Sequence, residues 1–211
     1  MWTAAIIAGG QAQRLGGCDK GALLVGDQTI LAHQIAVLRE VVDEILIVTN
    51  RRSRARFRDV AVPIAIDLLP DRGPLGGIYT ALSVAAGERS LIVAADMPFL
   101  SVQFLRHMVA LGETADIVVP RTNDGYQPLC ATYARVCAAQ MRERLTAGAL
   151  KAVDFLREAE GLTIRELGSD DIGPFDSDGT LFFNVNTPDD YARAIQHARH
   201  RPAPLLTGHD A

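Results

Sequence analysis

The chain has 211 residues, 48% of them hydrophobic and 22% charged, and a formal net charge of −4. This composition predicts one globular domain with a substantial core. The acidic balance offers nothing to attract nucleic acid or an anionic membrane surface, and no apolar run approaches the roughly 20 residues that span a bilayer. The three cysteines form neither a C-x-x-C pair nor a set with metal-ligand spacing, so we expect reduced thiols and a cytoplasmic protein.

Apolar runs of strand length alternate with segments of helical periodicity. We predict strands at 2–8, 44–48, 63–66, 91–95 and 116–119, with helices at 30–40, 78–86 and 104–111. In the second half of the chain, we predict a strand at 126–133, helices at 134–145 and 152–159, a strand at 162–166 and a final helix at 188–199. This alternation predicts an α/β fold, a doubly wound, mostly parallel sheet with helices on both faces. Residues 1–200 are expected to form a single domain, and 201–211 a flexible tail.

A glycine-rich loop follows the first predicted strand. Five of the fourteen residues from Ala8 to Gly21 are glycines, which let backbone N–H groups approach a ligand closely. Arg14 and Lys20 add the positive charge that a triphosphate requires. The loop matches neither the Walker A pattern nor G-x-G-x-x-G, so a dinucleotide is not the expected ligand. A plain connection is the alternative, but such turns usually need only about two to six residues.

Two further loops carry polar or small residues beyond predicted strands. Residues 70–77 precede a helix expected to open at Ile78, and their glycines would leave N–H groups free to face a ligand, unless they simply form a tight turn. Asp96 follows a wholly apolar strand. It could cap the next helix, although Ser101 fits that role better, or it could bind Mg²⁺, which prefers one or two carboxylates together with phosphates and water.

Five segments in chain order resemble the molybdenum cofactor guanylyltransferases. Residues 7–20 resemble that family's L-A-G-G-x-x-x-R-M-G-G-x-D-K, with Ile7 and Leu15 as conservative departures. Residues 73–78 are similar to G-P-L-A-G-I, and 95–98 to C-D-T/M-P, with Ala95 in place of cysteine. Residues 127–131 resemble Q-P-L-x-A, and 184–189 resemble N-x-N-T-P-E/D. The resemblance therefore spans nearly the whole chain.

The resemblance implies a Rossmann-like nucleotidyltransferase fold and an enzyme that uses Mg²⁺ and GTP. It would transfer GMP to the terminal phosphate of molybdopterin, loaded with molybdenum, and release pyrophosphate. Asp96 would hold the metal, and the residues acting in catalysis would be Asp96, Lys20 and Arg14. The residues expected to bind nucleotide, metal or acceptor are Ala8, Gly9, Gly10, Lys20, Asp67, Gly76, Asp96, Asn184 and Asn186. A cofactor-delivery protein or a target enzyme is a conceivable partner.

Two rival functions remain open. One is a cytidylyltransferase that uses CTP with the same acceptor, although Gly9-Gly10 and Gly73-Pro74-Leu75 look more like the guanine-specific pattern. The other is a nucleotide-binding scaffold without turnover. The absence of Lys20 or Asp96 would have indicated such a scaffold, but both residues are present.

Five arginines between Arg51 and Arg58 form a basic run. They are either a solvated face or a patch that attracts the anionic pterin or a carrier protein. The five histidines share no motif, and we expect none of them to act as a general base, because a phosphate nucleophile needs none.

Overall fold

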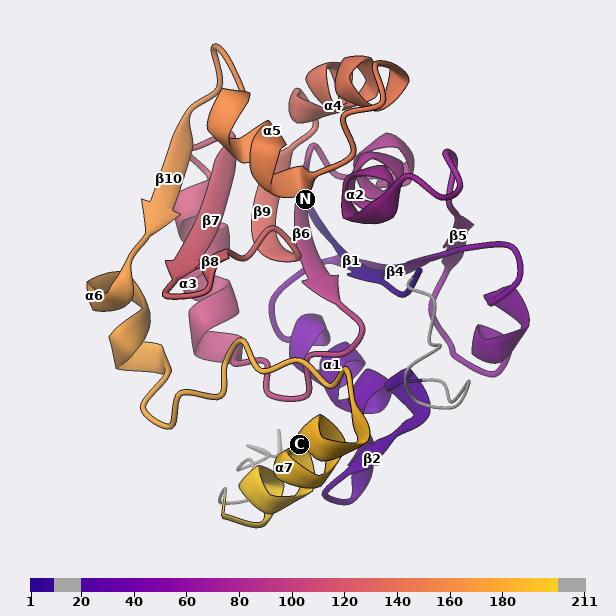
Figure 1. The fold of residues 1–211 in the computed structure, drawn as a ribbon, viewed down its shortest axis with the longest axis vertical. Helices are drawn as coiled ribbons and strands as arrows, with labels where there is room; N and C mark the ends of the chain where they lie inside the picture. The colour runs from indigo at the N-terminus through magenta and orange to yellow at the C-terminus, as the bar shows by residue number, and fades with distance from the viewer. Residues whose placement is uncertain (10–19, 201–211) are drawn as a thin grey trace, which may run out of the picture.

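A mixed, mostly parallel β-sheet forms the centre of the protein in the computed structural model, which describes residues 1–9 and 20–200 except for the side chain of Lys20 (Figure 1). The strands lie in the order β10-β7-β9-β6-β1-β4-β5. Among these, β9 runs antiparallel to both neighbours, and the short β8 pairs antiparallel with β7. The strands are β1 (Trp2–Ile7), β4 (Glu44–Thr49), β5 (Ile64–Ile66), β6 (Arg89–Ala94), β7 (Ile117–Thr122), β8 (Gly125–Tyr126), β9 (Cys130–Ala134) and β10 (Ile164–Leu167).

Helices cover both faces of this sheet. Helices α1 (Ile30–Arg39) and α3 (Val102–Gly112) pack on one face, and α2 (Gly73–Val84), α4 (Cys137–Thr146) and α5 (Ala152–Glu158) on the other (Figure 1). A hydrophobic core lies on each face of the sheet, and alternate residues of the apolar strands contribute to one core or the other. In β1, Ala4 and Ile6 face α1, whereas Ala5 faces α2. The predicted doubly wound fold is confirmed.

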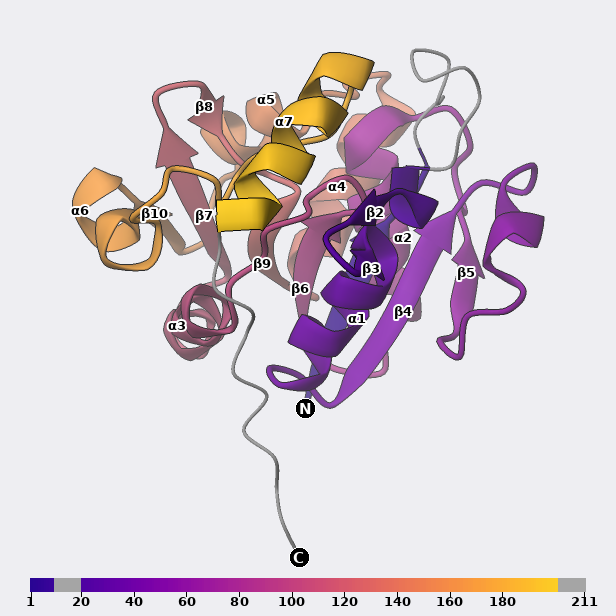
Figure 2. The ribbon, with the colours of Figure 1, turned by 90° about the horizontal axis from the view of Figure 1, so that it is seen from below.

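A smaller unit lies beside the sheet (Figure 2). The hairpin of β2 (Leu24–Val25) and β3 (Gln28–Thr29) follows the 3₁₀ turn Lys20–Ala22. The last helix, α7 (Pro188–His200), packs against this region through Ala194, and the Tyr191 hydroxyl donates to the Leu24 carbonyl at 2.9 Å. The remaining short elements are the 3₁₀ turns Arg54–Phe57 and Gly173–Phe175 and helix α6 (Ser169–Ile172).

Two element boundaries were predicted wrongly. Helix α2 begins at Gly73, five residues before the predicted start at Ile78, and carries Pro74 in its first turn, a position that proline favours. Gly76 and Gly77 therefore lie inside the helix, and a Cβ on Gly77 would lie 2.9 Å from Ile7 Cγ2. These glycines let α2 approach β1 closely.

The predicted strand 126–133 is in fact two strands, β8 and β9, separated by a turn in which the Cys130 amide donates to the Gln127 carbonyl at 2.9 Å. The predicted tail, 201–211, lies outside the described residues. Within the described ranges, the structure contains no helix with both the length and the apolarity that crossing a membrane requires.

Candidate active site

The carboxyl ends of four neighbouring strands meet at one edge of the sheet. The Ala8 amide donates to the Val48 carbonyl at 2.8 Å, and the Asp67 amide donates to the Thr49 carbonyl at 2.9 Å. The Ala95 amide donates to the Ile7 carbonyl at 3.1 Å. These bonds align the chain beyond β6, β1, β4 and β5 along a single rim about 14 Å wide, because neighbouring strands lie about 4.8 Å apart. In doubly wound sheets, ligands bind beyond this edge, where the order of the strands reverses.

The β1 end of the rim carries Ala8 and Gly9. Thr49 Oγ1 donates to the Ala8 carbonyl at 3.1 Å, which fixes the backbone before the glycine-rich loop. Gly9 is exposed, and the space where a Cβ would lie is open. Gly10, Arg14 and the side chain of Lys20 lie outside the described residues, so their predicted roles in binding and catalysis stay predictions.

Asp67 lies at the β5 end of the rim and is held by a small polar network. Its Oδ1 accepts hydrogen bonds from Thr80 Oγ1 at 2.9 Å and from the Leu69 amide at 3.1 Å. Thr80, which is completely buried in α2, also accepts from the Leu68 amide at 3.0 Å. The carboxylate is therefore anchored on one oxygen and half-buried, which fixes its orientation at the sheet edge.

Asp96 lies at the β6 end of the rim and lines a cavity of about 570 Å³. The Val185 amide donates to the Asp96 carbonyl at 2.9 Å, which brings Asn184 and Asn186 to the same cavity although they are about ninety residues away in sequence. Ser101 caps α3 by accepting from the Phe104 amide at 3.3 Å, so the helix does not use Asp96 as its cap. The structure thus gathers three of the predicted site residues.

Two polar residues in this cavity were missed by the sequence analysis. Lys151 precedes α5 and is exposed at the cavity wall. Gln127 also lines the cavity, and its Nε2 donates to Thr122 Oγ1 at 3.0 Å. The motif around Gln127 was recognised without a role, and Lys151 is an isolated cation in a loop. Only the folding of α5 over the sheet brings it near Asp96.

Gly76, predicted to bind nucleotide, is buried in the first turn of α2. Its amide donates to the Arg72 carbonyl at 3.4 Å, and an added Cβ would lie 2.8 Å from Arg72 Cβ. Gly76 therefore makes a close packing contact, whereas Gly73 and Pro74 of the same segment line the cavity. A contact between Gly76 and nucleotide stays a prediction.

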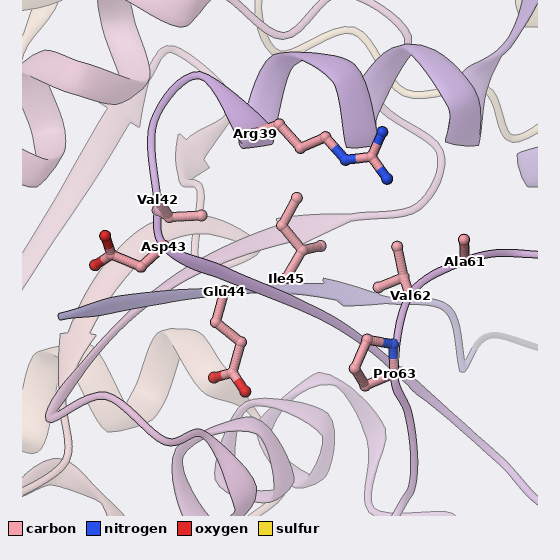
Figure 3. Close-up of a pocket in the computed structure, with 8 residues that line it drawn as sticks. All are labelled: Arg39, Val42, Asp43, Glu44, Ile45, Ala61, Val62 and Pro63. Atoms are coloured by element: carbon pink, nitrogen blue, oxygen red, sulfur yellow. The ribbon is translucent and has the colours of Figure 1, made fainter.

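A second cavity, of about 320 Å³, lies at the opposite edge of the sheet, where β4 and β5 begin (Figure 3). Its carboxylates have structural partners. Asp43 Oδ2 accepts from the Trp2 amide at 2.9 Å, and Glu44 Oε2 accepts from Thr3 Oγ1 at 2.6 Å and from the Ala86 amide at 3.1 Å. These groups tie strand starts together, and the cavity lies away from the rim where ligands bind.

Three histidines have packing or local roles. His107 stacks on Phe175, with ring centroids 5.2 Å apart, and His197 packs between Phe99 and Phe183. His200 Nδ1 lies 2.8 Å from the Gln196 carbonyl. None of these three lines the cavity at Asp96.

The rim and its cavity are those of a nucleotidyltransferase, and residues 4–162 match the model of the MobA-like NTP transferase domain, the family to which this chain belongs. A probable molybdenum cofactor guanylyltransferase from Pelotomaculum thermopropionicum is 35% identical over 195 residues, which cover 91% of each chain. A probable molybdenum cofactor guanylyltransferase from Natranaerobius thermophilus is 31% identical, over 92% of this chain and 95% of its own. The resemblance inferred from the motifs is confirmed.

A solved structure shares the fold. Molybdopterin-guanine dinucleotide biosynthesis protein A from Archaeoglobus fulgidus superposes with a TM-score of 0.78 at 24% sequence identity. The match covers 94% of this chain and 99% of the other.

Proposed function

We propose that the protein transfers GMP from GTP to the terminal phosphate of molybdopterin, loaded with molybdenum, to give the guanine dinucleotide cofactor and pyrophosphate. The observation that carries this proposal is the cavity that joins Asp96, Asn184, Asn186 and Lys151 beside the end of β1. Two relatives that are 35% and 31% identical along nearly their whole lengths bear the name of this activity.

The nucleotide would lie along the rim, with its base toward β5 and its phosphates toward β6. Guanine presents two neighbouring N–H donors on one edge, and a carboxylate is an acceptor-only group that suits them. Asp67 supplies such a carboxylate, held in place by Thr80. Adenine and cytosine lack that pair of donors, so a site built around Asp67 would leave its carboxylate less well paired with either base.

The acceptor would occupy the cavity, with its phosphate near Lys151. An oxygen of that phosphate forms a bond to the α-phosphorus of GTP, while the bond from the α-phosphorus to the bridging oxygen breaks and its electrons leave with pyrophosphate. A phosphate monoester has a second pKa of about 6 and is largely ionised at about pH 7. No side chain has to remove a proton. The protein's task is to hold the two phosphates in line.

The residues around Asp96 fit a magnesium ion. Asp96 offers a carboxylate, and Asn184 donates its amide nitrogen to the Phe182 carbonyl at 2.9 Å, which leaves its amide oxygen as an acceptor. The described residues hold no group of three His, Cys, Asp or Glu that could bind a metal. Mg²⁺ is commonly held by one or two carboxylates, with phosphate oxygens and water as its other ligands. Bound there, it would neutralise charge that develops on the phosphates.

The test is a transfer assay with GTP, CTP or ATP, Mg²⁺ and molybdopterin, in which the dinucleotide product is identified by mass. We expect the guanine dinucleotide to be the main product, and Asp96→Asn to lower the rate by roughly 10²-fold or more with the fold intact. Preferential use of CTP would show that the enzyme belongs to the cytidylyl branch. Binding of GTP without any turnover would support the non-catalytic scaffold instead.

A further inference from the structure

The chain between β4 and β5 carries a group of exposed arginines without a role in the proposed reaction. We call residues Arg51–Arg58 the arginine segment. Arg58 pairs with Asp59 at 3.4 Å. In the part of the chain that the structure describes, the other four arginines of the segment have exposed side chains and no carboxylate within ion-pair distance; they are Arg51, Arg52, Arg54 and Arg56. Their charge is directed to solvent.

The backbone of the arginine segment is anchored to the domain. Asn50 Oδ1 accepts from the Ser53 amide at 2.9 Å, and the Arg56 amide donates to the Ser53 carbonyl at 3.0 Å, which closes two consecutive turns. Phe57, only 3% exposed, inserts into the core beneath α1. The four guanidinium groups are therefore displayed from a fixed part of the surface.

This surface adjoins the rim where the nucleotide is proposed to bind. Arg51 comes two residues after Thr49, the residue that contacts both Ala8 and Asp67. Two residues of chain span at most about 7 Å. The segment lies at the edge of the sheet next to β5 (Figure 1), on the side where the base of the nucleotide would lie.

The position of the four arginines matters because the molecule as a whole is negatively charged. The whole chain carries a net charge of −4, and the rim itself holds the carboxyl groups of Asp67 and Asp96. A nucleoside triphosphate is strongly negative, so local positive charge beside the rim favours its approach. Four exposed guanidinium groups, unpaired within the described residues, add positive charge beside the rim, and this charge acts over a Debye length of about 8 Å in physiological salt. A local positive field raises the rate at which anionic ligands reach a site.

We propose that the arginine segment is an electrostatic capture surface for the polyphosphate group of the incoming nucleotide. It attracts the nucleotide during encounter and does not contact it in the seated complex. This inference rests on the proposed function, because it takes a nucleoside triphosphate as the substrate that enters along this side of the rim.

The test measures nucleotide association by stopped flow with a fluorescent GTP analogue. The variant is R51Q/R52Q/R54Q/R56Q, and the matched control is R39Q/R142Q/R157Q/R199Q, which removes the same charge from four other exposed arginines. At about 20 mM salt we expect the association rate constant of the variant to fall about five- to tenfold, and the difference to shrink below about twofold at 0.5 M salt. The control should stay within about twofold of the parent, and the dissociation rate should hardly change.

A second measurement varies the charge of the ligand. The loss in association rate should decrease from the GTP analogue to the GDP analogue to the GMP analogue, because the attraction scales with ligand charge. An unchanged association rate, an equal loss in the control, or a loss that ignores ligand charge would overturn the inference. Normal nucleotide association with impaired transfer would also overturn it and would indicate a docking surface for an acidic protein. If the parent binds CTP in place of GTP, the proposed function fails, but the same comparison with a CTP analogue still decides the role of the segment.

Discussion

The contact between Thr80 and Asp67 allows the nucleotide side of the site to be perturbed without touching a group that would meet the ligand. Replacing Thr80 by Val keeps the shape of the side chain and removes its hydroxyl. Asp67 Oδ1 then loses its 2.9 Å donor but keeps the Leu69 amide, and the Leu68 amide loses its 3.0 Å acceptor. Thr80 is completely buried, so water cannot take the place of the hydroxyl within α2.

The expected loss of stability follows from these two bonds. A hydrogen bond to a charged group contributes about 1.5–3 kcal/mol and a neutral one about 1 kcal/mol. Asp67 is only half-buried, and Leu68 is exposed, so solvent compensates in part. We expect Thr80→Val to lower the free energy of unfolding by about 2 kcal/mol, which is roughly 4–8 °C in Tm for a chain of this size.

The functional effect should be on binding of the nucleotide. With the Asp67 carboxylate less firmly oriented, we expect the KM for GTP to rise about tenfold, equivalent to about 1.4 kcal/mol, with kcat within a few-fold of the parent. The control is Thr80→Ser, which retains the hydroxyl and should keep a KM near that of the parent, at a stability cost of about 1 kcal/mol for the lost methyl group. A Val variant that is destabilised but binds GTP as the parent does would refute the assignment of Asp67 to the base. A Ser variant as defective as Val would show that the hydroxyl is not the cause.

The other predictions follow from contacts in the core and the cavity. Lys151→Ala should raise the KM for the acceptor about tenfold or more in initial-rate assays, with recovery in Lys151→Arg, and equal rates for Ala and the parent would remove Lys151 from the acceptor site. Gly77→Val should destabilise the protein by about 1–3 kcal/mol in denaturant titrations, because its Cβ would lie 2.9 Å from Ile7 Cγ2. A stability equal to the parent's would mean that β1 can move to accommodate the side chain. Burial raises the pKa of the Cys130 and Cys137 thiols from 9.0 to about 12. A folded-state pKa above the unfolded value stabilises the protein at low pH, and this contribution is lost as pH rises from about 9 to about 12, so the free energy of unfolding should fall across that interval. In a Cys18→Ser variant both thiols should resist an aromatic disulfide reagent at about pH 8 until denaturant is added, and rapid reaction of the native protein would contradict their burial.

The parallel half of the sheet was predictable because its strands are continuous apolar runs. Residues 2–7 and 91–94 lack a polar face, and this pattern requires cover on both sides. The direction of β9 was not predictable, since an apolar pattern of residues does not indicate whether a strand runs parallel or antiparallel to its neighbours. The hairpin turn between Thr122 and Gly125 decides it, because it reverses the chain so that β8 and β9 both run antiparallel to β7. The start of α2 was misjudged because Gly76 and Gly77 resemble loop residues, while their actual role is to let a helix pack closely on β1.

The site was predictable where a side chain follows directly from a strand. Asp96 was predicted from its place after an apolar strand; Asp67, which was named by resemblance, also comes just beyond a strand, so local sequence sets the position of both at the rim. Asn184 and Asn186 were also found by resemblance, and no nearby periodicity shows that the chain returns to β6 at these residues. Lys151 was missed for the same reason, since the placement of α5 depends on long-range packing through Phe155 and Leu156 rather than on its own sequence.

The hydrogen bond from the Val185 amide to the Asp96 carbonyl joins two parts of the chain that are far apart in sequence. The family model matches residues 4–162, so Asp96 lies within the matched range and Val185 lies beyond it. One wall of the cavity thus comes from residues within the matched range, and the other comes from a later part of the chain that returns to β6. On the proposed function, residues 184–186 would therefore contribute to the choice of acceptor as well as to the metal site. A chimera that carries residues 163–200 from a relative with a different acceptor would test this contribution.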